Sequence, residues 1–107
     1  MKYKSIRVIV KLPGEEARTE TIENTLQAFQ NAVGGYIETV TITGDLVVIC
    51  DEDGRLKGLP YNCSICGVDF VGPILGVGVK RDNFADAPIG AAEFTRLFID
   101  KEGGERE

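Results

Sequence analysis

LQAFQNAVGGYIE, residues 26–38, holds a short helix, a two-glycine exit and the start of a strand, with no spare residues between them. Ile22, Leu26, Phe29 and Val33 follow one another at spacings of four, three and four, which places them on one stripe of a helix. A helix of this length, about 15 Å, is marginally stable in isolation. The stretch therefore predicts a helix whose apolar stripe packs on a β-sheet.

Both ends of this helix carry sequence signals. Asn24 is predicted as the N-cap, and Gln27 lies three residues later, where its side chain can reach back to the N–H of the cap residue. Gly34 is predicted to end the helix in the left-handed conformation, which glycine adopts without steric cost. Gly35 then lets the chain reverse directly into a strand that begins at Tyr36.

Length and composition indicate one small globular domain. Of the 107 residues, 43% are hydrophobic and 27% are charged, values that are ordinary for a soluble protein. We expect a single domain over 1–100 and a disordered tail over 101–107. The net charge of −5 argues against nonspecific binding to nucleic acid or anionic membranes. No apolar run approaches the ~18 residues of a spanning helix, and the N-terminus lacks a signal-peptide pattern, so the expected location is the cytoplasm.

The chain contains no histidine. Ser-His-Asp and Cys-His triads, imidazole zinc ligands and the commonest general base are therefore excluded. The sequence shows neither a pair of acids placed for proton transfer nor an activated nucleophile. We expect a protein that is not an enzyme, with no catalytic residue and no cofactor.

Strand-like stretches and turn signals alternate along the rest of the chain. Residues 4–12 alternate apolar and polar side chains, with Ile9 as the exception, as in a half-buried strand. LVVIC, residues 46–50, is a continuous apolar run, as expected for a strand buried on both faces. The strands are predicted over residues 4–12, 17–22, 36–43, 46–50 and 68–79. In the last of these, Gly72, Gly76 and Gly78 leave one face nearly bare, which indicates close approach of another backbone or a helix.

A second helix is expected near the C-terminus. Asp86 or Ala87 leads into it, with Pro88 in its first turn. Residues 93–99 fit this helix but also fit a strand. The predicted fold class is α+β: a mostly antiparallel sheet of about five strands, with a short helix (about 25–33) packed on one face and the second helix near the C-terminus.

Three cysteines raise the question of a metal or redox site. Cys63 and Cys66 have the spacing of a pair that holds one edge of a zinc tetrahedron or forms a redox couple. A structural zinc needs four ligands, and Cys50 is the only further thiol in a chain without histidine. An odd number of cysteines also argues against a disulfide framework. Three ordinary reduced cysteines and no metal is the favoured interpretation.

Two further motifs fit a ligand site poorly. DEDG, residues 51–54, supplies the first acids of a calcium loop, but Leu56 and Asn62 occupy the positions where that loop requires glycine and glutamate. VGPILGVGVK, residues 71–80, lacks the lysine–serine or lysine–threonine pair and the helix of a phosphate loop. We interpret the first as a polar turn and the second as a strand.

A small polar site is predicted beside the strand that follows the two glycines. Tyr36 and Glu38 share a face with Val40 and Ile42, and a carboxylate on the core side of a sheet needs a partner. The candidate residues for binding a ligand or a partner's backbone are Tyr36, Glu38, Arg55, Lys57, Asn62, Lys80 and Arg81. A structural ion pair at the sheet edge is the plainer interpretation of the same residues.

Three stretches resemble a family of small uncharacterised proteins that forms a domain of unknown function. They are LQAFQNAVGGYIE at 26–38, CDEDGRLKGLPYN at 50–62 and VGPILGVG at 71–78. The resemblance covers roughly residues 5–80, and its Gly-Leu-Pro-x-Asn pattern includes Gly58, Pro60 and Asn62. Cys63-Ser64-Ile65-Cys66 departs from the polar or basic residues usual there, and the second helix lies outside the resemblance. Such proteins are common in phages, plasmids and conjugative elements, so the resemblance implies a mobile-element context without an established activity.

The expected function is that of a non-enzymatic accessory protein of a phage or conjugative element that binds a host protein or a small ligand. One alternative is a phage counter-defence inhibitor or a nucleotide-binding sponge, and another is a small metal-binding module that uses the cysteines. The sequence leaves the partner and the oligomeric state open, a homo-oligomer included.

Overall fold

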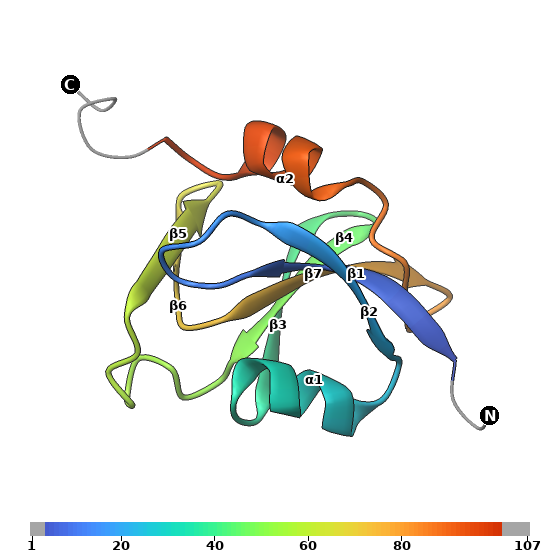
Figure 1. The fold of residues 1–107 in the computed structure, drawn as a ribbon, viewed down its shortest axis with the longest axis horizontal. Helices are drawn as coiled ribbons and strands as arrows, with labels where there is room; N and C mark the ends of the chain where they lie inside the picture. The colour runs from blue at the N-terminus through green and yellow to red at the C-terminus, as the bar shows by residue number, and fades with distance from the viewer. Residues whose placement is uncertain (1–3, 102–107) are drawn as a thin grey trace.

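The computed structural model describes residues 4–101, which form eight strands with a helix on either side of them (Figure 1). The strands are β1 (Ser5–Lys11), β2 (Arg18–Glu23), β3 (Ile37–Thr43), β4 (Leu46–Asp51), β5 (Tyr61–Ile65), β6 (Val68–Val71), β7 (Ile74–Lys80) and β8 (Asn83–Ala85). The helices are α1 (Leu26–Val33) and α2 (Ala91–Phe98). Neither helix in this part of the chain is long and apolar enough to cross a membrane.

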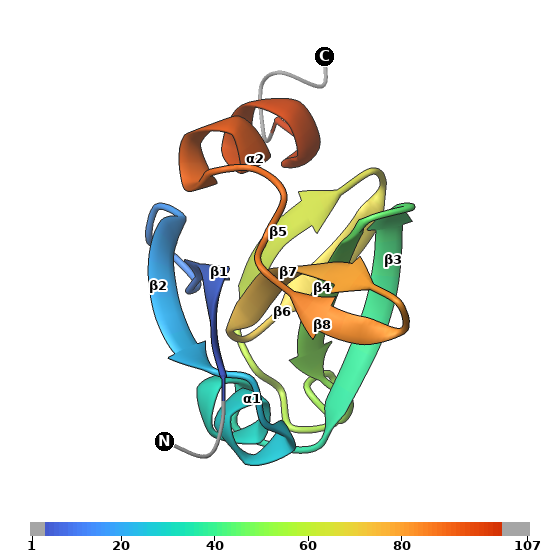
Figure 2. The ribbon, with the colours of Figure 1, turned by 90° about the vertical axis from the view of Figure 1, so that its right-hand side faces the viewer.

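A six-stranded antiparallel sheet forms the body of the fold. Its strand order is β2-β1-β7-β4-β3, with β8 paired to β7, and β5 and β6 form a separate two-stranded sheet. Strand β7 joins two hairpins, because Gly76 lies opposite Ile9 of β1 on one side and opposite Val48 of β4 on the other. The outer strands on this path are β2 and β3, which Figure 2 shows at opposite sides of the sheet.

One face of the sheet packs against α1. Val8 and Val47 point toward this helix from the central strands, and Phe29 and Val33 of α1 are buried against them. Ile9, next to Val8, points to the opposite face and is buried there as well. Burial of β1 on both faces is the reason why Ile9 breaks the alternation of its strand.

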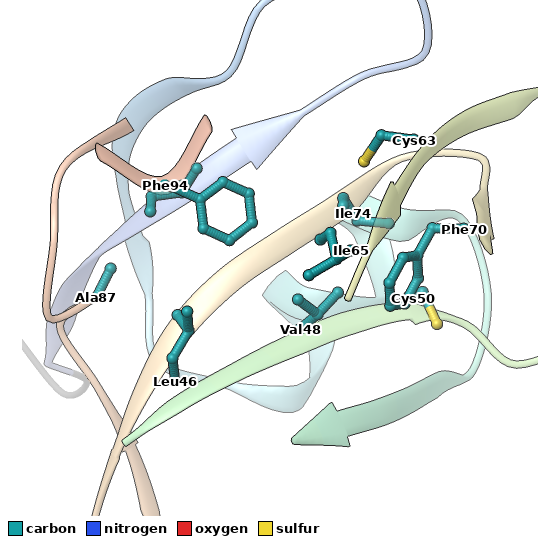
Figure 3. Packing of buried hydrophobic residues seen from close by; sticks show 10 residues of the cluster. Leu46, Val48, Cys50, Cys63, Ile65, Phe70, Ile74, Ala87 and Phe94 are labelled. Atoms are coloured by element: carbon teal, nitrogen blue, oxygen red, sulfur yellow. The ribbon is translucent and has the colours of Figure 1, made fainter. Parts of the chain in front are cut away.

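The other face of the sheet is covered by the β5–β6 hairpin and by α2. Ile65 of β5, Phe70 of β6 and Phe94 of α2 are buried in one cluster with Leu46 and Val48 of β4 (Figure 3). Every residue of β4 is buried, as its continuous apolar run predicts. Asp51, the last residue of β4, is the exception to the apolar character of this strand.

The predicted α+β class with a mostly antiparallel sheet is confirmed, and the strands predicted over 4–12, 17–22, 36–43 and 46–50 agree with β1 to β4. The strand predicted over 68–79 is wrong as a single element. Gly72, with a φ of 72°, and Pro73 break it into β6 and β7, which belong to different sheets. Strands β5 and β8 were not predicted. Residues 93–98 are helical, and all of the predicted tail after residue 101 lies outside the described residues.

The start of α1 differs from the prediction. Thr25, not Asn24, is the N-cap, and its side-chain oxygen accepts a hydrogen bond from the N–H of Ala28 at 3.1 Å. Asn24 instead donates through Nδ2 to the backbone oxygen of Phe84 at 2.9 Å, which ties the helix entry to β8. Gln27 bonds to a side chain one turn further along the helix, so it does not complete a capping box.

The exit of α1 agrees with the prediction, since Gly34 has a φ of 90° and its N–H closes the last turn. Leu26 does not join the core stripe and is 57% exposed. The second helix begins later than predicted, at Ala91 with Gly90 as its N-cap, so that Pro88 precedes the helix and is not part of its first turn.

The bare face of β7 admits close neighbours, as predicted. A Cβ at Gly78 would overlap the backbone oxygen of Asp86, and a Cβ at Gly76 would lie 3.4 Å from the ring of Phe94. The N–H of Ala87 donates to the backbone oxygen of Arg7 at 2.8 Å. The segment between β8 and α2 therefore crosses directly over β7.

Candidate functional site

The carboxylate of Asp51, at the end of β4, is buried at the base of a loop. Its side chain is 1% exposed, and one of its oxygens lies 2.7 Å from the Nζ of Lys57. The other oxygen accepts a hydrogen bond from the backbone N–H of Asp53 at 2.8 Å. Hydrogen bonding to Lys57 lowers the pKa of Asp51 despite the opposing effect of burial, and the Asp53 N–H acts in the same direction as Lys57. Residues 52–58, held in this way, are named the anchored loop.

The anchored loop is also fastened to the exit of α1. Nζ of Lys57 donates to the backbone oxygen of Gly34 at 3.1 Å. A Cβ at Gly35 would lie 2.7 Å from that Nζ and 2.9 Å from a carboxylate oxygen of Asp51. A side chain at position 35 would therefore displace the ion pair, which occupies that space. The two sequence stretches 26–38 and 50–62 meet at this contact.

A polar cavity of about 510 Å³ opens beside the ion pair. Tyr36, with 69% of its surface exposed, and Lys57 both line it, so the structure brings these two predicted site residues together. Its complete lining is Gln30, Asn31, Gly34, Gly35, Tyr36, Asp53 and Lys57.

A second cavity, of about 400 Å³ and named the β3–β6 slot, lies beside the same loop. Glu38 and Arg55 both line it, so these predicted residues are also brought to one place. Its complete lining is Glu38 and Val40 of β3, Cys50 and Asp51 of β4, Glu52, Arg55 and Leu56 of the anchored loop, and all four residues of β6. Glu38 is exposed and makes no ion pair within residues 4–101, so the carboxylate that needs a buried partner is Asp51 and not Glu38.

The thiol of Cys50 in the lining of the slot has a raised pKa. Its pKa is raised to about 11, first by burial and then by the carboxylates of Glu38 and Asp51, against a smaller opposing effect of Arg55. This thiol is therefore protonated at neutral pH.

Lys80 and Arg81 are not brought to Tyr36 and Glu38. They line a separate cavity of about 880 Å³, together with Lys4 and Asn24 at the start of α1. Strand register explains the separation, because Glu38 lies opposite Cys50 near one end of β4, whereas Lys80 follows the β7 residues that pair with the other end of β4.

Asn62 lies inside the fold, where its side chain bonds to the backbone of two other segments. It is buried, and its Nδ2 donates to the backbone oxygens of Lys11 at 2.8 Å and Gly72 at 2.7 Å. The N–H of Gly72 in turn donates to the backbone oxygen of Pro60 at 2.8 Å, and Gly58 has a φ of 70°. The Gly-Leu-Pro-x-Asn segment thus connects β1, β5 and the β6–β7 turn.

The thiols of the Cys-Ser-Ile-Cys motif do not converge. Cys63 is buried in the core cluster that contains Cys50, whereas Cys66 is exposed in the β5–β6 turn with a φ of 52°. Within residues 4–101, no group of three or more histidine, cysteine, aspartate or glutamate side chains is arranged to hold a metal ion.

The buried ion pair of Asp51 is not predicted by the sequence pattern. DEDG is typical of a polar turn, and an aspartate at a turn gives no reason to expect burial. Two signals point to it in retrospect: Asp51 directly follows the buried run LVVIC, and a lysine lies six residues later.

A search of curated proteins and a search of solved structures each find no match to this chain. A family model described as Domain of unknown function (DUF3846) matches residues 6–99. This match reaches from β1 past α2, and so it includes the second helix, which the sequence resemblance over roughly 5–80 leaves out. The chain therefore belongs to the family described as Domain of unknown function (DUF3846).

Proposed function

We propose that this protein is a non-enzymatic accessory protein of a phage or conjugative element, and that it binds a host protein through the anchored loop and the residues beside it. The observation that carries this proposal is Leu56, which is 89% exposed on a loop held in place by the buried carboxylate of Asp51. A contact residue on a loop that is already ordered loses little conformational entropy on binding, which favours affinity.

Other exposed apolar side chains border the anchored loop. Val68 lines the same slot and is 42% exposed, and Tyr36 lines the neighbouring polar cavity. Charged residues surround them, including Glu38, Glu52 and Arg55. Exposed apolar and aromatic groups with a charged rim are typical of protein-binding surfaces.

The state of Asp51 supports binding more than catalysis. A carboxylate whose pKa is lowered by a lysine is a poor proton acceptor near neutral pH. Lys57 is engaged by Asp51 and by the backbone oxygen of Gly34, so its ammonium is held by two partners although the side chain is 42% exposed. Both groups thus shape a surface and are badly placed for proton transfer.

A pull-down with matched variants tests the proposal. The purified protein is immobilised, exposed to lysate of a host bacterium, and its bound proteins are quantified by mass spectrometry. Leu56→Asp is expected to reduce recovery of a specific partner by about tenfold or more, as for a central interface residue. Leu97→Asp is the control, since Leu97 is 54% exposed on α2, and it should leave recovery unchanged. Equal recovery with both variants would contradict the proposal.

The nucleotide-sponge alternative rests on a different observation. Lys4, Lys80 and Arg81 are basic side chains that line the cavity of about 880 Å³ at the start of α1. Native mass spectrometry of protein purified from cells, compared with its denatured mass, tests this alternative directly. A mass excess that matches a nucleotide, and that Lys80→Ala and Arg81→Ala remove, would favour the sponge. An excess that matches zinc would favour the metal-binding module, and bare protein would argue against both.

A further inference from the structure

The β3–β6 slot has a strand edge on each of two sides. Strand β3 is the last of its sheet, and β6 pairs only with β5, so within residues 4–101 each has one side without a strand neighbour. The outer side of β5 is occupied, because Ile99 forms a bridge with Ile65 and the N–H of Asp100 donates to Ser64 at 2.8 Å. Residues of β3 and all of β6 line one cavity, so two edges without a strand neighbour border the same space.

The backbone groups at these edges can be identified. The N–H of Glu52 donates to the backbone oxygen of Tyr36 at 2.8 Å, which makes these two residues a hydrogen-bonded pair of the β3–β4 ladder. Since such pairs alternate in antiparallel sheets, the N–H and C=O of Thr39 point away from β4. On β6, the backbone oxygen of Asp69 accepts a hydrogen bond from the side chain of Arg55 at 2.6 Å. The guanidinium of Arg55 thus donates to a backbone oxygen that would otherwise accept a hydrogen bond from the N–H of a neighbouring strand.

The sequence of β3 does not protect its edge. IETVTIT contains no proline or lysine, and Glu38 is its only charged residue. In β2, the outer strand on the other side, RTETIE carries three charged residues in six positions. Charged residues, and lysine and proline in particular, are the usual protection of edge strands against pairing. Strand β3 is therefore the edge of this sheet that is open to an added strand.

The side chains of the slot indicate which strand would fit. Val40 and the exposed Val68 contribute apolar surface, and the lining residues include four acids and one arginine. Asp51 is paired with Lys57, and the Asp69 carboxylate accepts a hydrogen bond from the Ser64 hydroxyl, which leaves Glu38 and Glu52 against Arg55. A cationic segment is attracted to such a site, whereas two copies of this chain would bring like charges together.

We propose that the β3–β6 slot binds an extended segment of a partner protein, with alternating apolar and basic residues, which adds as a strand between β3 and β6. The backbone of the segment pairs with the outward groups of Thr39 and replaces Arg55 at the oxygen of Asp69. Its apolar side chains contact Val40 and Val68, and its basic side chains meet the carboxylates of Glu38 and Glu52. This inference rests on the proposed function and narrows it to a surface and a chemical class of partner.

The test uses the whole protein and a labelled peptide that alternates valine and lysine, about seven residues long to match β3. Binding is followed by fluorescence anisotropy. The same peptide with glutamate in place of lysine tests the charge, and a version with alternate amides N-methylated tests backbone pairing. Both are expected to bind at least about tenfold more weakly than the valine–lysine peptide.

Charge reversal in the protein provides a matched pair of variants. Glu38→Lys is expected to weaken binding of the valine–lysine peptide by about tenfold, because attraction at the slot becomes repulsion. Glu23→Lys makes the same change at an exposed position of β2 and should leave binding unchanged. Equal weakening by both variants would overturn the proposal, since it would reflect net charge alone.

Proline substitution tests the backbone of β3. Thr39→Pro removes one outward N–H and is expected to abolish binding, while edge strands tolerate proline at such positions. Thr19→Pro is the matched control on β2 and should leave binding unchanged. The N–H of Asn24 donates to the backbone oxygen of Lys4 at 2.8 Å, and hydrogen-bonded pairs alternate from there along the β1–β2 ladder, so the N–H of Thr19 points away from β1. Hydrogen exchange with bound peptide should show new protection in β3 and β6. Protection elsewhere, or equal binding of the N-methylated peptide, would overturn the proposal.

The outcomes separate this inference from the proposed function. If Leu56→Asp removes the host partner but Glu38→Lys and Thr39→Pro both retain it, binding through the anchored loop stands and the strand-accepting slot is overturned. If none of the three variants changes partner recovery, both proposals fail. A dimer of the free protein that Thr39→Pro dissociates would also overturn the slot proposal, because a second copy would then be the occupant.

Discussion

Position 51 tolerates a buried carboxylate because groups from three places in the chain converge on it. Lys57 supplies the opposite charge, the N–H of Asp53 supplies a hydrogen bond, and Gly35 leaves the space that the ion pair fills. Buried ion pairs add little net stability compared with apolar residues of the same shape, but loss of one partner is strongly destabilising. The pair is therefore best understood as a fixing point for the anchored loop.

Removal of the Lys57 charge should destabilise the protein. Lys57→Met leaves the Asp51 carboxylate buried with only the Asp53 N–H as partner, and we expect a loss of about 2 kcal/mol in the free energy of unfolding at neutral pH. Urea denaturation of the two proteins measures this loss. Lys101→Met, at an exposed position, serves as the control for removal of a lysine charge. Equal stability of Lys57→Met and the parent protein would contradict the assignment.

The same group predicts a dependence of stability on pH. The pKa of Asp51 is lower in the folded than in the unfolded chain, so its contribution to stability is fully present above about pH 4 and is lost as the pH falls through the folded value. The free energy of unfolding of Asp51→Asn should therefore fall less steeply in acid than that of the parent protein. Denaturation curves measured from about pH 5 downward test this, and identical slopes would refute it.

The thiols should differ sharply in reactivity. Cys66 is exposed, whereas Cys50 is buried and has a pKa raised to about 11, so its reactive thiolate is rare at neutral pH. We expect Cys66 to account for the fast phase of alkylation by iodoacetamide, measured by mass spectrometry, and Cys66→Ser to remove that phase. Alkylation of Cys50 in the native protein at the rate seen in urea would show that its burial is misassigned.

At the scale of single elements, the sequence predicts the C-terminal end of α1 correctly but not its N-cap. Gly34 ends the helix through its own conformation, which is a local property and is readable from the sequence. Asn24 and Thr25 are both good N-cap residues, and local rules do not choose between them. Asn24 is engaged by Phe84, sixty residues later in the chain, which leaves Thr25 as the cap.

This choice of cap can be measured. Thr25→Ala removes the hydrogen bond to the N–H of Ala28 and should lower the free energy of unfolding by about 1 kcal/mol. Gln27→Ala, in the first turn of the same helix, should change it by less than about 0.5 kcal/mol, because that side chain bonds only within the helix surface. Chemical denaturation of both variants decides the point. A larger loss of stability for Gln27→Ala than for Thr25→Ala would instead support the predicted capping box of Asn24 and Gln27.

The β7–β8 connection is an element with unfavourable turn residues. Lys80 pairs with Asn83, and the two residues between them, Arg81 and Asp82, have φ values of 53° and 68°. Such a turn favours Asn-Gly, since both central residues are left-handed. Arg81→Asn combined with Asp82→Gly should raise the free energy of unfolding by about 1–2 kcal/mol, seen as a higher urea midpoint. An unchanged midpoint with Asn-Gly would show that the turn stores no strain.

At the scale of the whole molecule, the sequence predicts the class and the first four strands but not the second sheet. The strand signals of 46–50 and 4–12 are strong because their burial pattern is simple. In the part of the chain that the structure describes, residues 61–65 and 68–71 pair only with each other and with Ile99, so their structure depends on partners that local patterns do not reveal. The β3–β6 slot lies between these two sheets. The sequence predicts that Glu38 and Arg55 lie near each other, but it does not predict the cavity, because the cavity depends on how the two sheets pack.

The layered core makes a prediction about local stability. Most residues of β4 and β7 are buried, and both strands have neighbours on either side in the sheet. Their amides should exchange with solvent only through global unfolding and be the slowest in the protein, while those of β2 should exchange faster. Hydrogen exchange followed by NMR tests this order. If the amides of β2 exchanged as slowly as those of β4, the outer edge of β2 would be covered in solution.

The central place of β7 also sets the order in which the protein can assemble. The hairpins β1–β2 and β3–β4 each close locally, but β7 lies between them and pairs with residues up to about seventy positions earlier. The sheet is therefore discontinuous until that strand has been synthesised and inserted, and such long-range pairing slows folding. A nascent chain that ends before β7 holds two hairpins with exposed apolar edges, and these edges can associate with other chains. We expect insertion of β7 to be the committing step of folding, and truncation before residue 74 to yield aggregates in place of a smaller domain.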